Sequence, residues 1–262
     1  MIASLFLGVL ILFALIAPLC SSYASDETHL ALKNLSPCKQ FWFGTDELGR
    51  DLFTRIWWGA RISLSIGLAA SCIDLLIGIL FAATAVLLGG RIEQILLQIA
   101  DILYSIPYLL VVILLTTWIG PGFFSILLAL TLTGWIKIAR ILRSQFLQIK
   151  QMGFVQTATI LGANKSKILL DHLLPNCLGQ IIITLTLTIP SAIFAEAFLS
   201  FLGLGIQAPF ASWGTMASDA LTALQSHPWR LVFPASFISL TLLAFSLVGE
   251  GLRDAFDPRS IP

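Results

Sequence analysis

Three acidic side chains stand where the chain is otherwise apolar. Asp74 and Glu196 fall within long apolar stretches, and Asp101 stands at the edge of another. An unpaired charge near the middle of a bilayer costs at least about 2.5–3.5 kcal/mol on insertion scales, so such residues normally face water or a partner group. We therefore expect each of the three carboxyl groups to have a partner or access to water.

The sequence lacks the clusters that catalysis or metal binding would need. His29, His172 and His227 lie far apart, and there is neither a G-x-x-x-x-G-K-[ST] phosphate loop nor a G-x-S-x-G nucleophile elbow. The four cysteines have no metal-site spacing and are either free thiols or include one Cys20–Cys38 disulfide. We predict no catalytic residue, no metal site and no ATP hydrolysis by this chain. The cysteines are Cys20, Cys38, Cys72 and Cys177.

The elements that carry these residues are long and apolar. Of the 262 residues 57% are hydrophobic and 11% charged, against about 25% charged in an ordinary soluble domain. Uncharged stretches longer than about 18 residues cross a bilayer as helices, because lipid offers the backbone no hydrogen-bond partners. The predicted fold class is therefore all-α, a polytopic transmembrane helical bundle. The uncharged stretches are 1–25, 102–136, 173–195, 197–218 and 231–249.

Six spans account for this pattern, because Gly120-Pro121-Gly122 places a turn inside the longest stretch. Residues 1–25 lack the basic segment of a signal peptide and are predicted to be an uncleaved first transmembrane helix. An external polar segment follows at 26–61, and a five-helix core domain occupies 62–262. The predicted spans are 2–22, 62–88, 95–119, 122–142, 176–204 and 231–250.

The distribution of basic residues favours an orientation with both termini in the cytoplasm. With six spans both termini lie on one side, and nine of the 15 Lys and Arg residues fall on that side. This places the polar link at 143–175 in the cytoplasm. The net charge of +1 gives no basic field for nucleic acid.

The link at 143–175 is predicted to hold two short helices. The first ends near Gly162, where a residue without Cβ can adopt a left-handed C-cap. The second covers Lys165 to His172 and is stopped by Pro175 before the fifth span. Two short helices at a membrane face can insert into a groove of a partner protein. Apolar side chains recur at helical spacing in the first helix, at Phe154, Val155, Ala158 and Leu161.

This link resembles the loop of bacterial ABC importer permeases, whose pattern is Glu-Ala-Ala, three residues, Gly, nine residues and Ile-x-Leu-Pro. Gln156-Thr157-Ala158, Gly162 and His172-Leu173-Leu174-Pro175 stand at that spacing. From about residue 41 to the end, further motifs resemble the dipeptide and oligopeptide branch of this family. They are FGTDELGRD at 43–51, GARISL at 59–64, EAFLSFLGLG at 196–205, SWG at 212–214 and GLRDAFDPR at 251–259.

The resemblance implies a type I ABC importer permease fold and a peptide-translocating subunit in the bacterial cytoplasmic (inner) membrane. The implied partners are a second permease subunit in a heterodimer, two ATP-binding subunits, an extracytoplasmic substrate-binding protein and membrane lipid. ATP and Mg²⁺ would be bound by the partner subunits, so this chain would carry no cofactor. Within the same family the solute could instead be a nickel chelate or another small solute. A secondary transporter is the alternative from another class, and it would be expected to show inverted repeats.

The resemblance also implies roles for individual residues. Asp101 and Glu196 become candidates for the translocation path, although Asp101 could also be an interfacial charge and Glu196 a helix-pairing group. Asp74 is expected to pair with the second permease. The loop departs from the family pattern at Gln156, Thr157 and Gly153, so either the ATPase subunit has changed to match or coupling is weakened. The implied ATPase-docking residues are Phe154, Val155, Gln156, Thr157, Ala158, Gly162, Ala163, His172, Leu174 and Pro175.

Overall fold

The computed structural model describes residues 2–21 and 23–256, and this part of the chain is helical with no β-strand. The all-α prediction is therefore confirmed. Residue 22, at the end of the first predicted span, and motif residues 257–259 lie outside the described residues. The α-helices are α1 (Ile2–Cys20), α2 (Leu52–Leu88), α3 (Gly90–Ser105), α4 (Tyr108–Ile119), α5 (Phe123–Thr133), α6 (Trp135–Lys150), α7 (Gly153–Ile160), α8 (Lys165–Lys167), α9 (Leu174–Phe201), α10 (Trp213–Ala220) and α11 (Trp229–Phe256).

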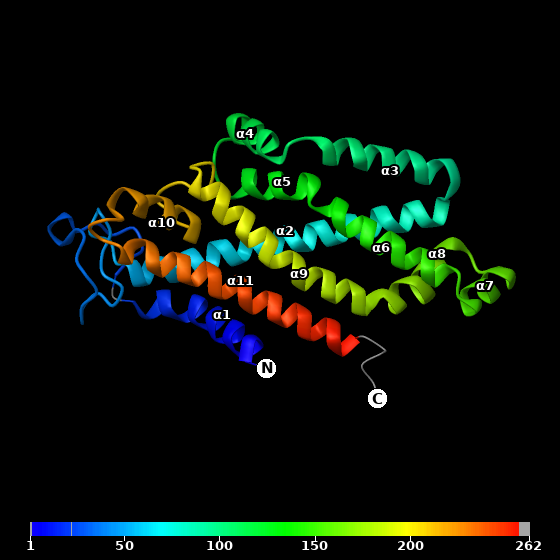
Figure 1. The fold of residues 1–262 in the computed structure, drawn as a ribbon, viewed down its shortest axis with the longest axis horizontal. Helices are drawn as coiled ribbons and strands as arrows, with labels where there is room; N and C mark the ends of the chain where they lie inside the picture. Colours follow the sequence, from blue (N-terminus) through cyan, green and yellow to red (C-terminus); the bar gives the residue numbers. More distant parts are fainter. Residues whose placement is uncertain (1, 22, 257–262) are drawn as a thin grey trace.

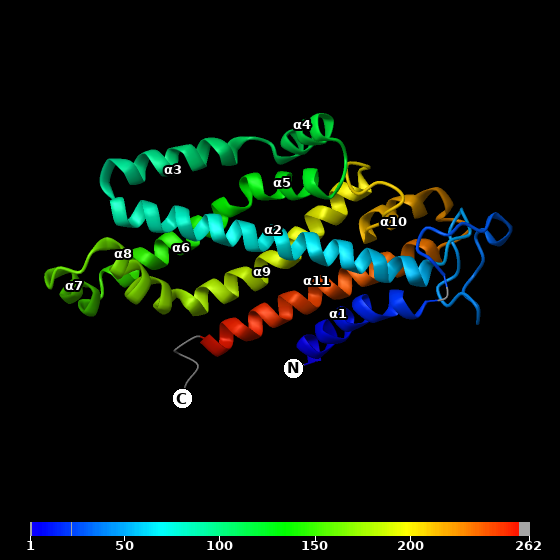
Figure 2. The same ribbon diagram turned by 180° about the vertical axis from the view of Figure 1, so that it is seen from behind.

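The helices form an elongated bundle with two different ends (Figure 1). One end, which we call the α7 end, carries α7 and α8. The other, the α10 end, carries α10 and the irregular segment between α1 and α2. Seen from both sides, α1 runs beside α11, and α3 and α4 lie along the opposite edge of the bundle (Figures 1 and 2).

Among the described residues five helices are long and apolar enough to cross a membrane. They are α1, α2, α5 continued by α6, the helix from Lys165 to Phe201, and α11. The pair α3 and α4, bent by 77° at their junction, makes a sixth span if counted as one. This agrees with the prediction of about six spans. The uncharged stretch 197–218 is not a span, because α9 ends at Phe201 and the chain turns at Gly203 (φ +80°) before the short helix α10.

The central helix α2 begins at Leu52 and not at 62, where apolarity alone placed its start. The Asp51 side chain caps it by accepting hydrogen bonds from the backbone N–H groups of Phe53 and Thr54. Arg61, inside this early part, reaches α1 and donates to the carbonyl oxygens of Ala14 and Leu15 at 2.6 Å each. Arg61, one of the charged residues that delayed the predicted start, is thus satisfied by a contact with another helix.

Small side chains let α2 pack closely against its neighbours. It makes its most extensive contacts with α6 and α9, and close helix packing in membranes favours small residues at the contact. The buried face of α2 follows this rule, with Gly59, Ala60, Ser63, Gly67, Ala70, Ser71, Gly78 and Ala82.

The prediction that Pro175 stops the helix before the fifth span is wrong. From Lys165 to Phe201 the chain forms one span-length helix, in which a π-helical turn (Ile168–Leu173) joins α8 to α9. Proline lacks a backbone N–H and crowds the preceding turn of a regular α-helix, and at Pro175 it falls where the wider turn ends. The observed loop is also shorter than the predicted range 143–175, because α6 continues to Lys150.

Candidate functional site

The C-cap predicted at Gly162 is present at the α7 end. Gly162 has φ +85°. Its N–H donates to the Thr159 carbonyl at 3.1 Å, and the Ala163 N–H donates to the Ala158 carbonyl at 3.0 Å. These two bonds and the left-handed residue are the Schellman arrangement that ends a helix. Asn164 then starts the next helix by accepting from the Lys167 N–H at 2.7 Å.

One residue anchors α7 while most of its surface is open. Val155 is 0% exposed and belongs to a cluster with Phe146, Ile168 and Leu173. The ring of Phe154 lies 6.1 Å from that of His172, which connects α7 to the π-helical turn. Of the predicted docking residues, Phe154, Gln156, Thr157, Gly162 and Pro175 are exposed, whereas Ala158, Ala163, His172 and Leu174 are half-buried.

The predicted docking residues do not include the most exposed apolar side chains of this end. Ile160 and Leu161 are 86% and 82% exposed. Large apolar side chains in such a position are typical of a surface that a partner covers. Leu161 was recognised as part of the helical pattern, but side-chain spacing alone does not tell which apolar residues face the protein and which face outward.

An open cavity of about 720 Å³ lies between α2, α9, the α3–α4 break and the α5–α6 junction. The α3–α4 break at Ile106–Pro107 borders it, as does Gly134, which joins α5 to α6 with its backbone in the helical conformation. At membrane depth, irregular backbone is tolerated where protein buries it or where it lines a cavity. Polar residues that border this cavity include Asp74, Tyr108, Thr133, Lys137, Gln180 and Thr184.

Neither sequence candidate for the translocation path borders this cavity. Asp101 forms an ion pair with Arg140 at 2.6 Å, and the two side chains are 64% and 44% exposed. Glu196 is fully buried and accepts hydrogen bonds from the hydroxyls of Ser63 at 2.8 Å and Ser200 at 2.7 Å. The geometry of Glu196 therefore fits its alternative role as a helix-pairing group between α2 and α9.

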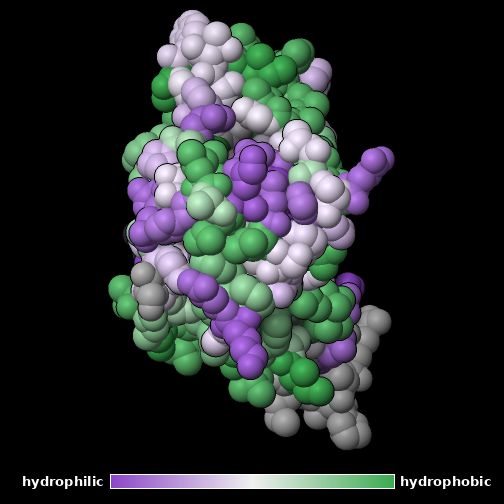
Figure 3. Space-filling model, turned by 90° about the vertical axis from the view of Figure 1, so that its left-hand side faces the viewer, coloured by the Kyte–Doolittle hydropathy of each residue, from purple (hydrophilic) through white to green (hydrophobic). Residues whose placement is uncertain are grey.

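A buried ion network holds the irregular segment at the α10 end. The Asp46 carboxylate accepts from Arg50 Nε at 2.6 Å and lies 3.5 Å from Arg55 Nε. Arg230 of α11 donates to the Asp219 carbonyl oxygen at 3.2 Å. Asp219 is an exposed residue, but partial desolvation by its neighbours raises the pKa of its carboxyl above the ordinary value, and the charge of Arg55 opposes this shift. Figure 3 shows the molecule from the α10 end, where hydrophilic side chains gather between hydrophobic ones.

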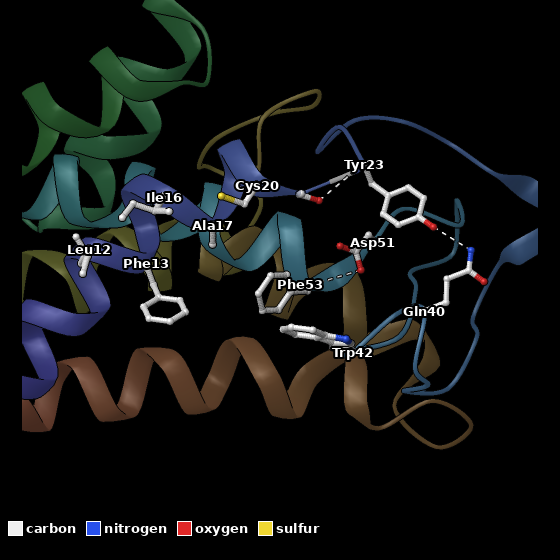
Figure 4. Close-up of a pocket in the computed structure, with 11 residues that line it drawn as sticks. Leu12, Phe13, Ile16, Ala17, Cys20, Tyr23, Gln40, Trp42, Asp51 and Phe53 are labelled. Atoms are coloured by element: carbon white, nitrogen blue, oxygen red, sulfur yellow. Dashed lines mark hydrogen bonds between the residues drawn. The ribbon is translucent and has the colours of Figure 1, made fainter.

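A second pocket, of about 510 Å³, lies beside α1 at the α10 end. In Figure 4, apolar side chains of α1 line one part of it, and the Tyr23 hydroxyl accepts from the Gln40 amide at the other. Cys20 borders this pocket, and Cys20 and Cys38 are both exposed free thiols. The structure thus contains the free-thiol alternative and not a Cys20–Cys38 disulfide.

Comparison with known proteins agrees with this architecture. The family model "Binding-protein-dependent transport system inner membrane component" matches residues 74–261. The chain is 51% identical to the oligopeptide transport system permease protein OppC of Bacillus subtilis, over 99% of this chain and 85% of that protein. It is 55% identical to the dipeptide transport system permease protein DppC of the same organism, over 95% of this chain and 78% of that protein.

A solved structure shares the fold at much lower identity. An inward-facing MetNI methionine ABC transporter matches with a TM-score of 0.62 and 16% identity, over 77% of this chain and 97% of that chain. This likeness concerns the fold alone, and it supports the predicted type I permease architecture. Because the family model matches most of the chain and the identities extend over nearly all of it, the chain belongs to the family of binding-protein-dependent transport system inner membrane components.

Proposed function

We propose that this chain is one of two membrane-spanning permease subunits of an ATP-driven importer for dipeptides or oligopeptides. The observation that carries the substrate class is its identity of 51–55% to an oligopeptide and a dipeptide permease over nearly the whole chain. The cavity beside the α3–α4 break supports the same function, because it offers a solute a partly polar site in an apolar bundle.

The proposed assembly is a heterodimer with a second permease, bound to two ATPase subunits and an extracytoplasmic substrate-binding protein. The outer edge formed by α3 and α4 suits the contact with the second permease. Ala100 is the one buried residue of α3, while Leu114 and Trp118 of α4 are 64% and 88% exposed. ATP and Mg²⁺ are bound by the ATPase subunits in this proposal.

The α7 end is the proposed docking site for an ATPase subunit. Phe154, Ile160 and Leu161 offer it apolar contacts, and Val155 anchors α7 to the bundle. Because one span-length helix joins Lys165 to Phe201, a displacement at the docking site moves α9, which borders the cavity. ATP then drives transport by shifting the population between inward-open and outward-open states, since it binds one of them more tightly.

In this proposal the α7 end and both termini lie in the cytoplasm and the α10 end lies outside. Reporter fusions at Gly90, Lys165 and Arg253 are expected to report a cytoplasmic location, and fusions at Asp46 and Ser212 an external one. The physical reason is the excess of Lys and Arg on the side of the α7 end. A cytoplasmic signal from the fusion at Asp46 would contradict this orientation.

The reconstituted transporter is expected to accumulate labelled peptide in liposomes only when ATP, the binding protein and both ATPase subunits are present. This chain purified alone is expected to hydrolyse no ATP, because its sequence has no phosphate-binding loop. Hydrolysis by the isolated chain, with contaminants excluded, would remove the permease assignment. Accumulation of nickel without peptide would replace the proposed substrate class. Uptake driven by a proton gradient without ATP would indicate a secondary transporter.

A further inference from the structure

Two buried polar atoms beside the cavity have no hydrogen-bond partner in the described part of the chain. Asp74 is 4% exposed, yet its Oδ1 atom accepts no hydrogen bond. The Tyr108 hydroxyl is also buried without a partner. Both residues border the cavity. Because burying an unpaired polar group is costly, such groups commonly have a ligand or a functional role.

The chain holds Asp74 in place from one side only. Its carboxyl group has a hydrogen bond with the backbone N–H of Trp135, and its Oδ2 atom rests against Gly134. A Cβ at Gly134 would clash with this oxygen and would lie 2.8 Å from the Leu130 carbonyl oxygen. The missing Cβ of Gly134 therefore makes room for one carboxylate oxygen, and the other oxygen stays unpaired beside the cavity.

The two unpaired atoms can serve an ammonium group. A carboxylate oxygen accepts hydrogen bonds, and so does a phenolic oxygen, whereas an ammonium group has three donors and no acceptor. A metal ion is a poorer fit, because no group of three or more His, Cys, Asp or Glu residues that could hold one occurs in the described part of the chain. Lys137 also borders the cavity and has no ion pair among the described residues, so it offers a positive charge to a carboxylate.

We propose that the Asp74 carboxylate and the Tyr108 hydroxyl receive the α-ammonium group of a peptide in the cavity, while Lys137 faces its carboxylate. A peptide carries both groups, one at each end, and the cavity contains a complement to each. This inference rests on the proposed function, because it names the part of the peptide that the site recognises.

A labelling experiment on the assembled transporter, without binding protein, tests the site directly. The four cysteines are replaced by serine, and Thr133→Cys on the cavity wall reports access to a maleimide. Trialanine at millimolar concentration is expected to slow labelling several-fold, and N-acetyl-trialanine is expected to have no effect. In an Asp74→Asn background trialanine should also lose its effect. Equal protection by the two peptides, no protection by either, or full protection in the Asp74→Asn background would overturn the proposal.

A matched pair of tyrosine variants tests whether the protection by trialanine depends on the cavity. Tyr108→Phe is expected to weaken the protection by trialanine several-fold. Tyr23→Phe removes a hydroxyl at the α10 end and should leave protection unchanged; an equal effect of the two variants would contradict the site.

Co-purification of the second permease is measured for Asp74→Asn, and its loss would assign Asp74 to the subunit contact instead. Peptide uptake by the wild-type transporter is measured separately, so failure of the proposed function is distinguished from failure of this site.

Discussion

Replacement of Gly162 by valine is expected to abolish ATP-driven peptide uptake while the chain stays in the membrane. Gly162 has φ +85°. An ordinary L-residue in this left-handed region destabilises the fold by about 1–2 kcal/mol, and a β-branched side chain is disfavoured further. Relief of this strain would break the two cap bonds and change the angle between α7 and the π-helical turn. Uptake in a strain that lacks the chromosomal copy, with membrane levels checked by immunoblot, measures the effect.

Gly153, at the other end of α7, provides the matched control. A Cβ at either glycine meets no atom within 4 Å, and of the two only Gly162 has a positive φ. Gly153→Ala should therefore transport normally, whereas Gly162→Ala should show a partial loss. Gly162→Asn should retain most uptake, because asparagine tolerates the left-handed conformation. Full uptake by the Gly162→Val protein would show that this turn does not couple docking to transport, and the docking assignment would then fail.

Replacement of Asp46 by alanine is expected to destabilise the α10 end by about 3–5 kcal/mol, the usual cost of removing one partner of a buried ion pair. Arg55 is 4% exposed and would lose its carboxylate. The backbone N–H groups of Leu48 and Arg50, which donate to Asp46 Oδ1 at 2.9 Å each, would lose their acceptor. Thermal unfolding of the purified transporter and the rate of proteolysis within residues 26–51 report the change.

Asp26 is the control for this variant, because it lies in the same irregular segment and is exposed. Asp26→Ala is expected to change the free energy of unfolding by no more than about 0.5 kcal/mol. An unchanged unfolding temperature and an unchanged cleavage rate for Asp46→Ala would show that the network does not hold the segment to the bundle.

Local chain properties sufficed to predict several parts of this protein. The spans follow from length and apolarity, because lipid leaves a polar backbone no alternative to the helix. The end of α7 at Gly162 follows from the one residue type that adopts the left-handed conformation without strain. The family resemblance from the motif spacing was likewise available from the sequence, and relatives that match nearly the whole chain confirm it.

Helix boundaries depended on contacts that no local pattern records. Arg61 lies within α2 because α1 supplies carbonyl acceptors to it, although the two segments are more than 40 residues apart. Pro175 lies within a continuous helix because a π turn precedes it. In both cases the packed structure satisfies a group that would end a helix if the segment stood alone.

The roles of the candidate site residues depend on distant contacts in the same way. Glu196 and Asp74 share the same sequence signal, an acid in an apolar stretch, yet the fold surrounds Glu196 with hydroxyl donors and leaves one oxygen of Asp74 unpaired. The cavity joins residues of α2, α4, α6 and α9, and none of these helices contains it alone. The sequence by itself therefore determined which residues carry charge within the membrane. The tertiary structure decided which of these charges have partners, because those partners come from distant segments.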